Sequence, residues 1–376
     1  MFAFTYGRSY LERDDPLPLY GLPLVRGPQL PSVGEVAGAI ADAAPDAWGR
    51  RVVEARLLSH GTAPEALTLP TYLLESGSDR PGALDFQTSA TEYAPRQGPA
   101  ATLSDLANAA DLVDRGQPLP PSLDLALLHG SSLGGARPKA ALTDSGRALI
   151  AKFGSARDTY PAVKGEYVAM RLATLVGLKV APVELGTALG KDVLLVERFD
   201  RTPEAARRFM VSAVTVLGLD ELGGRYASYA DLADTIRAAF ASPEETLHEL
   251  FARITFNVLV GNSDDHAKNH AAFWDGEQLT LTPAYDIEPQ PRSGEERQQA
   301  MAIGKDGFRR SQVAGCVRHA ATYHLTEQEA RDIVDRQLAV IADSWTTVCD
   351  DAGLTEIDRS RYWRRSVLNP YATYDY

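Results

Sequence analysis

Apolar residues recur every three to four positions through much of the second half of the chain, which is the spacing of one helix face. This periodicity predicts helices at residues 229–240, 243–260 and 327–348. Strand-like runs become rare after residue 201. We therefore expect the C-terminal part of the chain to be helical.

Short apolar runs bounded by turn residues predict a β-sheet earlier in the chain. Runs at residues 139–142 and 148–153 flank an Asp-Ser-Gly turn signal at 144–146, which is typical of a hairpin. An apolar run at 193–196 predicts another strand, and helical spacing at 163–176 predicts a helix before it. These elements describe a small α/β lobe.

The first segment mixes short strand-like pieces with Pro and Gly turns. We expect a helix at 48–58 and a return strand at 84–86, which follows the turn sequence Asp-Arg-Pro-Gly. Residues 92–101 are polar and contain Pro, Gly and Gln, which predicts a linker. The sequence thus divides into three predicted parts: residues 1–95, 96–199 and 200–376.

Composition narrows the class of protein. The net charge of −12 argues against a chain that binds nucleic acid by itself, because phosphate contacts need clustered Lys and Arg. No apolar run approaches the ~20 residues that cross a bilayer, and the N-terminus lacks the basic and apolar regions of a secretory signal. Cys316 and Cys349 form no metal or redox motif. We expect a cytoplasmic protein without membrane contact.

Four polar residues stand in the order that phosphoryl transfer from a nucleotide requires. Asp264 and Asn269 have the D-x-x-x-x-N spacing of a protein-kinase catalytic loop, and Asp286 follows a predicted hairpin at 271–281. Lys152 lies earlier, near the end of a predicted strand. In kinases a lysine binds the α- and β-phosphates, an aspartate accepts the hydroxyl proton, and an asparagine and a second aspartate hold Mg²⁺. A β-rich small lobe followed by a helical large lobe is also the kinase plan.

A glycine-rich stretch at 130–139 precedes the strand with Lys152, where a kinase places its phosphate-binding loop. Glu166, one helix later, is a candidate ion-pair partner for Lys152. The alternatives are a plain turn for the glycines, an edge-strand lysine that reaches solvent, and a helix-start glutamate without special function.

The cluster around Asp264 also permits a metal-dependent hydrolase. His266 and His270 are four residues apart and would share one face of a helix, as in some zinc enzymes. The H-E-x-x-H glutamate is absent, and the Asp-to-Asn spacing fits a loop and not a helix. Asp286 has an alternative as a helix N-cap. We favour the kinase arrangement.

At these residues the chain resembles the HipA family, the kinases of type II toxin–antitoxin modules. The matching stretches are residues 79–86, 131–140, 195–201, 257–269 and 281–286. The resemblance implies an α+β, two-lobe protein-kinase-like fold with a small β-rich N-terminal subdomain and a helical C-terminal lobe. Residues 1–95 would be the N-terminal HipA-type subdomain, with its opening strands missing, followed by the kinase N-lobe and C-lobe.

The resemblance also implies roles for individual residues. Asp264 would be the catalytic aspartate, Asn269 and Asp286 the Mg²⁺ ligands, and Ser132 an autophosphorylated serine in a loop that governs ATP access. The ATP site would be formed by Lys152, Ser132, Gly134, Gly135, Ala136, Lys139, Glu197, Phe199, His266 and Lys268, with Glu197 to Phe199 as the adenine hinge. Some family members have glycine where this chain has Asp265.

The function implied is an ATP- and Mg²⁺-dependent serine/threonine protein kinase that acts as a growth-arrest toxin. Its partners would be a protein substrate and a small helix-turn-helix antitoxin like HipB, through which it would meet DNA only indirectly. Two alternatives stay open: a regulatory pseudokinase that binds antitoxin or nucleotide, and a kinase for small molecules or lipids.

Overall fold

The computed structural model describes residues 1–98, 101–117, 119–120, 123, 126–155, 157–291, 294 and 296–376. The chain forms two compact units. We call residues 40–163 and 182–210 the sheet unit, and residues 1–39, 164–181 and 211–376 the helical unit. Each unit is described by itself. The three-part division expected from the sequence remains a prediction.

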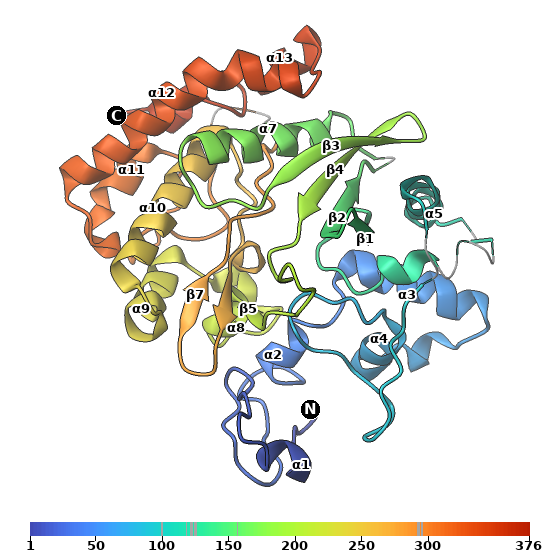
Figure 1. The fold of residues 1–376 in the computed structure, drawn as a ribbon. Helices are drawn as coiled ribbons and strands as arrows, with labels where there is room; N and C mark the ends of the chain where they lie inside the picture. Colours follow the sequence, from blue (N-terminus) through green and yellow to red (C-terminus); the bar gives the residue numbers. More distant parts are fainter. Residues whose placement is uncertain are drawn as a thin grey trace. The chain divides into compact units, whose positions relative to one another are not determined.

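Four antiparallel strands form the sheet of the sheet unit (Figure 1). In spatial order they are β1 (Lys139–Asp144), β2 (Arg147–Phe153), β4 (Lys191–Glu197) and β3 (Val183–Ala188). The turn between β1 and β2 places Ser145 and Gly146 at φ values of 50° and 81°. Two consecutive positive φ values match the twist of a two-residue hairpin, which explains why the Asp-Ser-Gly signal predicted this turn correctly.

The helices of the sheet unit are α3 (Ala47–Ser59), α4 (Leu69–Glu75) and α5 (Leu103–Asp114), with short 3₁₀ turns at Pro64–Ala66 and Ala126–His129. Helices α3 and α5 bury apolar residues in one core, and α4 packs against α3. Trp48 of α3 and Leu106 of α5 join Ala151 and Val193 of the sheet in this core. The helix α2 (Gly38–Ala41) lies where the chain passes from one unit to the other.

The helical unit contains most of the remaining elements. Its helices are α1 (Arg8–Leu11), α7 (Ala162–Leu175), α8 (Ala213–Val216), α9 (Tyr229–Ala239), α10 (Pro243–Val260), α11 (Val313–Arg318), α12 (Glu327–Asp351) and α13 (Glu356–Tyr362). A second sheet has the order β5 (Met210–Ser212), β6 (Ala271–Trp274) and β7 (Leu279–Leu281). The 3₁₀ turns are Gly223–Tyr226, Ala267–Asn269, Ala320–Tyr323 and Pro370–Thr373.

The central helix α10 positions the loop that carries the predicted catalytic residues. It begins at Pro243, whose missing N–H is not needed in a first turn, and every residue from Leu250 to Val260 is buried. Helices α9, α11 and α12 pack against it (Figure 1). Gly261 ends α10 in the left-handed region at φ 74°, and a Cβ there would lie 2.6 Å from the Ser366 carbonyl oxygen. Glycine is therefore required at the start of this loop.

The structure confirms the predicted fold class and the predicted helices and hairpins of the later segments. The return strand expected at 84–86 is wrong, as is the expected β-rich character of residues 1–95. Those residues, all of them described, form helices, turns and one isolated bridge between Phe4 and Gln29. Asp85 explains the missing strand, because its carboxylate accepts the Phe86 N–H and so competes with a strand partner.

The described residues of the predicted linker, 92–98 and 101, form no helix or strand. The Arg96 N–H donates to Ser78 Oγ, and its carbonyl oxygen accepts the Ser78 N–H at 2.8 Å. The Arg96 guanidinium also contacts the carboxylate of Asp85 at 3.0 Å. The segment is irregular in structure but attached to the sheet unit. Residues 99–100 lie outside the described residues.

Candidate functional site

In the helical unit, a short loop after α10 brings together the predicted catalytic residues. Residues 262–266 are irregular, a 3₁₀ turn follows at Ala267–Asn269, and β6 begins at Ala271. The Asn269 side-chain amide donates to the Asp264 carbonyl oxygen at 3.4 Å. The Gln290 N–H donates to the Gly261 carbonyl oxygen at 3.0 Å, which anchors the start of the loop.

Asp264 is exposed, whereas its neighbour Asp265 is buried. The surrounding protein still desolvates Asp264 in part, and this desolvation raises the pKa of its carboxyl. The charges of Asp286 and Asp265 raise that pKa further, against the opposing effects of His266 and Arg297. A reachable carboxylate with a raised pKa suits proton acceptance better than a buried one.

Asp265 has a different environment. Burial acts to raise its pKa, but the imidazole of His270 and hydrogen bonds from His270 and Tyr229 together hold that pKa below its ordinary value. Its Oδ2 atom lies 2.9 Å from His270 Nε2 and 2.5 Å from the Tyr229 hydroxyl. Because this carboxylate is enclosed and its acceptor atom engaged, Asp264 is the better candidate for the base.

Asp286 follows the β6–β7 hairpin and has an unusual backbone conformation with a positive φ angle. Its φ of 60° lies in the left-handed region, which costs free energy for residues other than glycine but is tolerated best by Asn and Asp. The preceding Tyr285 donates its hydroxyl to the Lys268 carbonyl oxygen at 2.7 Å, so the two segments are tied together.

The donor set of this loop fits a magnesium ion. The Asp286 charge raises the pKa of Asp264, so the two carboxylates repel each other. A divalent cation held by oxygen ligands such as Asp286 and the Asn269 amide would relieve this repulsion. Among the described residues, no group of three or more His, Cys, Asp or Glu side chains could hold a metal ion of any kind. His270 is instead paired with Asp265.

The sheet unit contains two lysines directly opposite each other. Lys139 of β1 pairs with Lys152 of β2 in the antiparallel register, and each is only 8% exposed. Side chains at directly opposed positions share one face of the sheet, and like charges there are destabilising. The Lys152–Glu166 ion pair expected from the sequence remains a prediction.

The glycine-rich loop before β1 is packed against neighbouring segments. Ser131 and Ser132 are each 1% exposed, and the Ser132 hydroxyl donates to the Asp79 carbonyl oxygen at 3.1 Å. The Gly135 N–H donates to the Asp46 carboxylate at 3.0 Å. At Gly135 φ is +85°, and a Cβ would come within 2.5 Å of Lys139 Nζ. The loop is thus compact, and the ammonium of Lys139, the first residue of β1, lies directly against the backbone of Gly135.

The predicted adenine hinge, Glu197 to Phe199, is supported by a charge cluster that the sequence did not reveal. Arg198 is buried, and its guanidinium bonds to the Asp200 carboxylate at 2.9 Å and to Asp79 at 2.9 Å. Arg201 bonds to the same two carboxylates. The Glu-Arg-Phe-Asp-Arg stretch could have suggested this cluster, but its partner Asp79 is too distant in sequence to be identified.

The remaining predicted ATP-site residues differ in their exposure and in their neighbours. Glu197 and Phe199 are half-buried, His266 is exposed, and the Lys268 ammonium lies 3.5 Å from the Glu221 carboxylate. Gly134 lies next to Asp46, whose Oδ2 would be 3.1 Å from a Cβ at that glycine.

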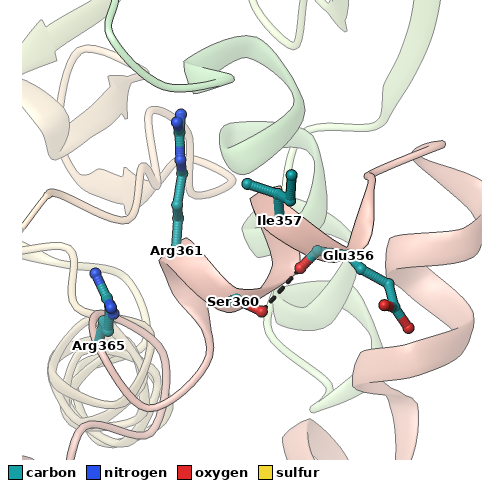
Figure 2. Close-up of a pocket in the computed structure, with 5 residues that line it drawn as sticks. All are labelled: Glu356, Ile357, Ser360, Arg361 and Arg365. Carbon is teal, nitrogen blue, oxygen red and sulfur yellow. Dashed lines mark hydrogen bonds between the residues drawn. The ribbon is translucent and has the colours of Figure 1, made fainter.

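Two cavities occur away from the predicted catalytic loop. The larger, of about 360 Å³, is lined by Glu356, Ile357, Ser360, Arg361 and Arg365 (Figure 2). It contains none of the predicted site residues. A smaller cavity of about 230 Å³ in the sheet unit includes Ala136 in its wall, so it adjoins the glycine-rich loop. No helix among the described residues is long and apolar enough to span a membrane.

Comparison with known proteins places the chain in a family. A sequence model described as the HipA-like C-terminal domain matches residues 131–345. The chain is 34% identical over 133 residues to a Sinorhizobium fredii protein named "Putative kinase Y4mE", an alignment that covers 33% of this chain and 31% of that protein. It is 27% identical over 200 residues to the serine/threonine-protein kinase toxin HipA of Shewanella oneidensis, with 46% of each chain covered.

Among solved structures, the chain is similar to the toxin–antitoxin complex of Shewanella oneidensis HipA and HipB with operator DNA. The TM-score is 0.69 at 20% identity, and the match covers 97% of this chain and 90% of that one. This likeness establishes the fold. The curated relatives are matched over less than half of their length.

Proposed function

The chain belongs to the HipA-like family, and we propose that it is an ATP- and Mg²⁺-dependent serine/threonine protein kinase. The observation that supports this most is the arrangement of the loop after α10. There an exposed Asp264 with a raised pKa lies within electrostatic range of Asp286, and Asn269 bonds to its backbone. An acceptor for a hydroxyl proton and two oxygen donors for a cation are the parts that phosphoryl transfer needs.

In the proposed reaction the substrate hydroxyl oxygen forms a bond to the γ-phosphorus of ATP while the bond to the β–γ bridging oxygen breaks and ADP leaves. The Asp264 carboxylate accepts the hydroxyl proton. The Asn269 amide and the Asp286 carboxylate would hold Mg²⁺, which supplies charge neutralisation for the phosphates. Lys139 and Lys152 would bind phosphate oxygens, and Glu197 to Phe199 would meet the adenine.

Incubation with radiolabelled ATP and Mg²⁺, followed by phosphoamino-acid analysis, tests this proposal. Phosphoserine or phosphothreonine in protein supports it. Label that enters only small molecules or lipids would favour a kinase for those acceptors, and nucleotide binding without transfer would favour a pseudokinase. Zinc, and not magnesium, restoring activity to metal-stripped protein would favour a hydrolase.

We further propose that the kinase is a cytoplasmic growth-arrest toxin whose partner is a HipB-like helix-turn-helix antitoxin. With a net charge of −12, the chain should not shift duplex DNA alone at near-physiological salt, because few phosphates can be neutralised. It should supershift a complex of antitoxin and operator in a gel-shift series. A strong shift by the chain alone, or no supershift with the antitoxin encoded beside it, would contradict this partnership.

Ser132 is expected to be autophosphorylated, and the modified protein is expected to be inactive. The Ser132 hydroxyl is buried and bonded to the Asp79 carbonyl oxygen, so a dianionic phosphate cannot remain in that place. The loop would have to leave its packed position, and the phosphate would repel those of ATP. Intact-mass spectra should show one added phosphate after incubation with Mg-ATP.

The neighbouring serine provides a matched control for this prediction. Ser131 is equally buried, and its hydroxyl oxygen accepts the Gly77 N–H at 2.8 Å. Ser132→Ala should abolish the added phosphate, and Ser131→Ala should not. An unmodified wild-type mass after prolonged incubation would remove the proposal.

A further inference from the structure

Three buried donors converge on one oxygen atom of Asp265. The Tyr229 hydroxyl donates to Oδ2 at 2.5 Å, the Asn257 side-chain amide donates at 2.8 Å, and His270 Nε2 lies at 2.9 Å. None of these four side chains belongs to the predicted kinase site. All four residues are 0–3% exposed, so the cluster is enclosed by protein.

The donors come from three different elements of the helical unit. Tyr229 begins α9, Asn257 lies in the last turns of α10, and His270 follows the 3₁₀ turn directly before β6. The Asn257 side-chain carbonyl also accepts the Asn262 amide at 3.0 Å, and Tyr229 and His270 pack edge to face at 5.6 Å. One carboxylate therefore fastens the catalytic loop to helices α9 and α10 and to His270 at the end of the same loop.

We propose that Asp265 is a positioning residue, which holds its neighbour Asp264 and the nearby Asn269 in place through the buried contacts with Tyr229, Asn257 and His270. This inference rests on the proposed kinase function. The loop from Asp264 to Asn269 contains only one short 3₁₀ turn, so its backbone hydrogen bonds alone fix it weakly. The cluster ties this loop to the surrounding elements through Asp265 and through His270, the residue after Asn269.

A direct chemical role for Asp265 does not fit the geometry. Its carboxylate is enclosed, with 3% of the residue exposed, and three donors already occupy Oδ2. Stability alone does not explain a buried charge at this position, because well-packed apolar residues often stabilise a core equally well or better. Precise placement of reacting groups is what such a cluster can supply, because a misplacement of about 1 Å costs on the order of 100-fold in rate.

A pair of tyrosines allows a matched experiment on the whole chain. Tyr229 and Tyr323 are both fully buried in the helical unit, and the hydroxyl of each is hydrogen-bonded. Tyr323 donates its hydroxyl to the Ile303 carbonyl oxygen at 2.7 Å and not to the Asp265 carboxylate. Tyr229→Phe and Tyr323→Phe therefore remove comparable hydroxyls, and only the first removes a contact with Asp265.

We expect Tyr229→Phe to lower the maximal rate of phosphate incorporation from Mg-ATP about tenfold or more, with the half-saturating ATP concentration unchanged. Hydrogen exchange of the backbone amides of residues 262–270 should become faster in the same variant. Tyr323→Phe should change neither quantity. Asp265→Asn should resemble Tyr229→Phe, and the double variant should be less than additive, because both substitutions act on one contact.

The outcomes separate this inference from the proposed function. A wild-type protein that transfers no phosphate would remove the kinase function, while the exchange measurement would still report on the attachment of the loop. If wild-type protein is active and Tyr229→Phe keeps its maximal rate, the positioning role is overturned. The same holds if Tyr323→Phe loses as much rate, or if exchange of residues 262–270 is unaltered.

Discussion

Asp264→Asn should reduce phosphoryl transfer by about 10²–10⁴-fold, the usual contribution of a general base. The substitution preserves shape but removes the proton acceptor and its charge. Asp264 is exposed, and the Asn269 amide bonds to its backbone carbonyl oxygen and not to its side chain. The fold should therefore be unaffected. The measurement is initial-rate transfer from radiolabelled ATP, with ATP binding and thermal unfolding followed in parallel.

Asp265→Asn is the informative control for this result. The two carboxylates are adjacent in sequence, but one is exposed and the other is enclosed by three donors. Asp264→Asn should leave hydrogen exchange in the loop unchanged, whereas Asp265→Asn should accelerate it. Wild-type turnover in Asp264→Asn, together with complete loss in Asp265→Asn, would transfer the role of base to Asp265.

Asp286→Ala should weaken Mg²⁺-dependent ATP binding at least about tenfold, which corresponds to ~1.4 kcal/mol. One of the proposed ligands disappears, and the charge of the triphosphate is then less well compensated. A fluorescent ATP analogue titrated with and without Mg²⁺ measures the effect. Binding that keeps its full Mg²⁺ dependence in Asp286→Ala would show that the metal is held elsewhere.

The backbone at Asp286 requires a second variant. Its φ of 60° suits Asn and Asp better than Ala, so Asp286→Ala also adds local strain. Asp286→Asn keeps a compatible backbone and one oxygen ligand while it removes the charge. Loss of Mg²⁺ dependence in both variants indicates the metal site, and loss in the alanine variant alone indicates strain.

Local patterns predicted much of this fold. The helix at 243–260 matches α10 to the residue, and the hairpin around Ser145 was predicted from its turn residues. These elements depend on periodicity and turn chemistry, which are local properties of the sequence. The strand expected at 84–86 failed because the Asp85 side chain satisfies the backbone that a strand would have paired.

The sequence proposed the reactive residues of the candidate site but not the residues that surround them. The spacing of Asp264 and Asn269 identified the loop, yet two adjacent aspartates carry no sign of which one is buried. The donors to Asp265 lie up to 36 positions away, and tertiary packing alone brings them together. The role of Asp79 as a partner of Arg198 could not be predicted, for the same reason.

The Arg198 cluster also determines which parts of the chain can be exchanged between relatives. Arg198 donates to the Arg80 carbonyl oxygen at 2.7 Å across 118 positions, and Asp200 accepts the Gly82 N–H. Removing one partner of a buried ion pair costs about 3–5 kcal/mol. A chimera that imports a foreign segment at 197–201 without the matching turn at 79–82 would leave buried charges unmatched. The two segments therefore form a single unit of recombination, although most of the sheet unit separates them in sequence.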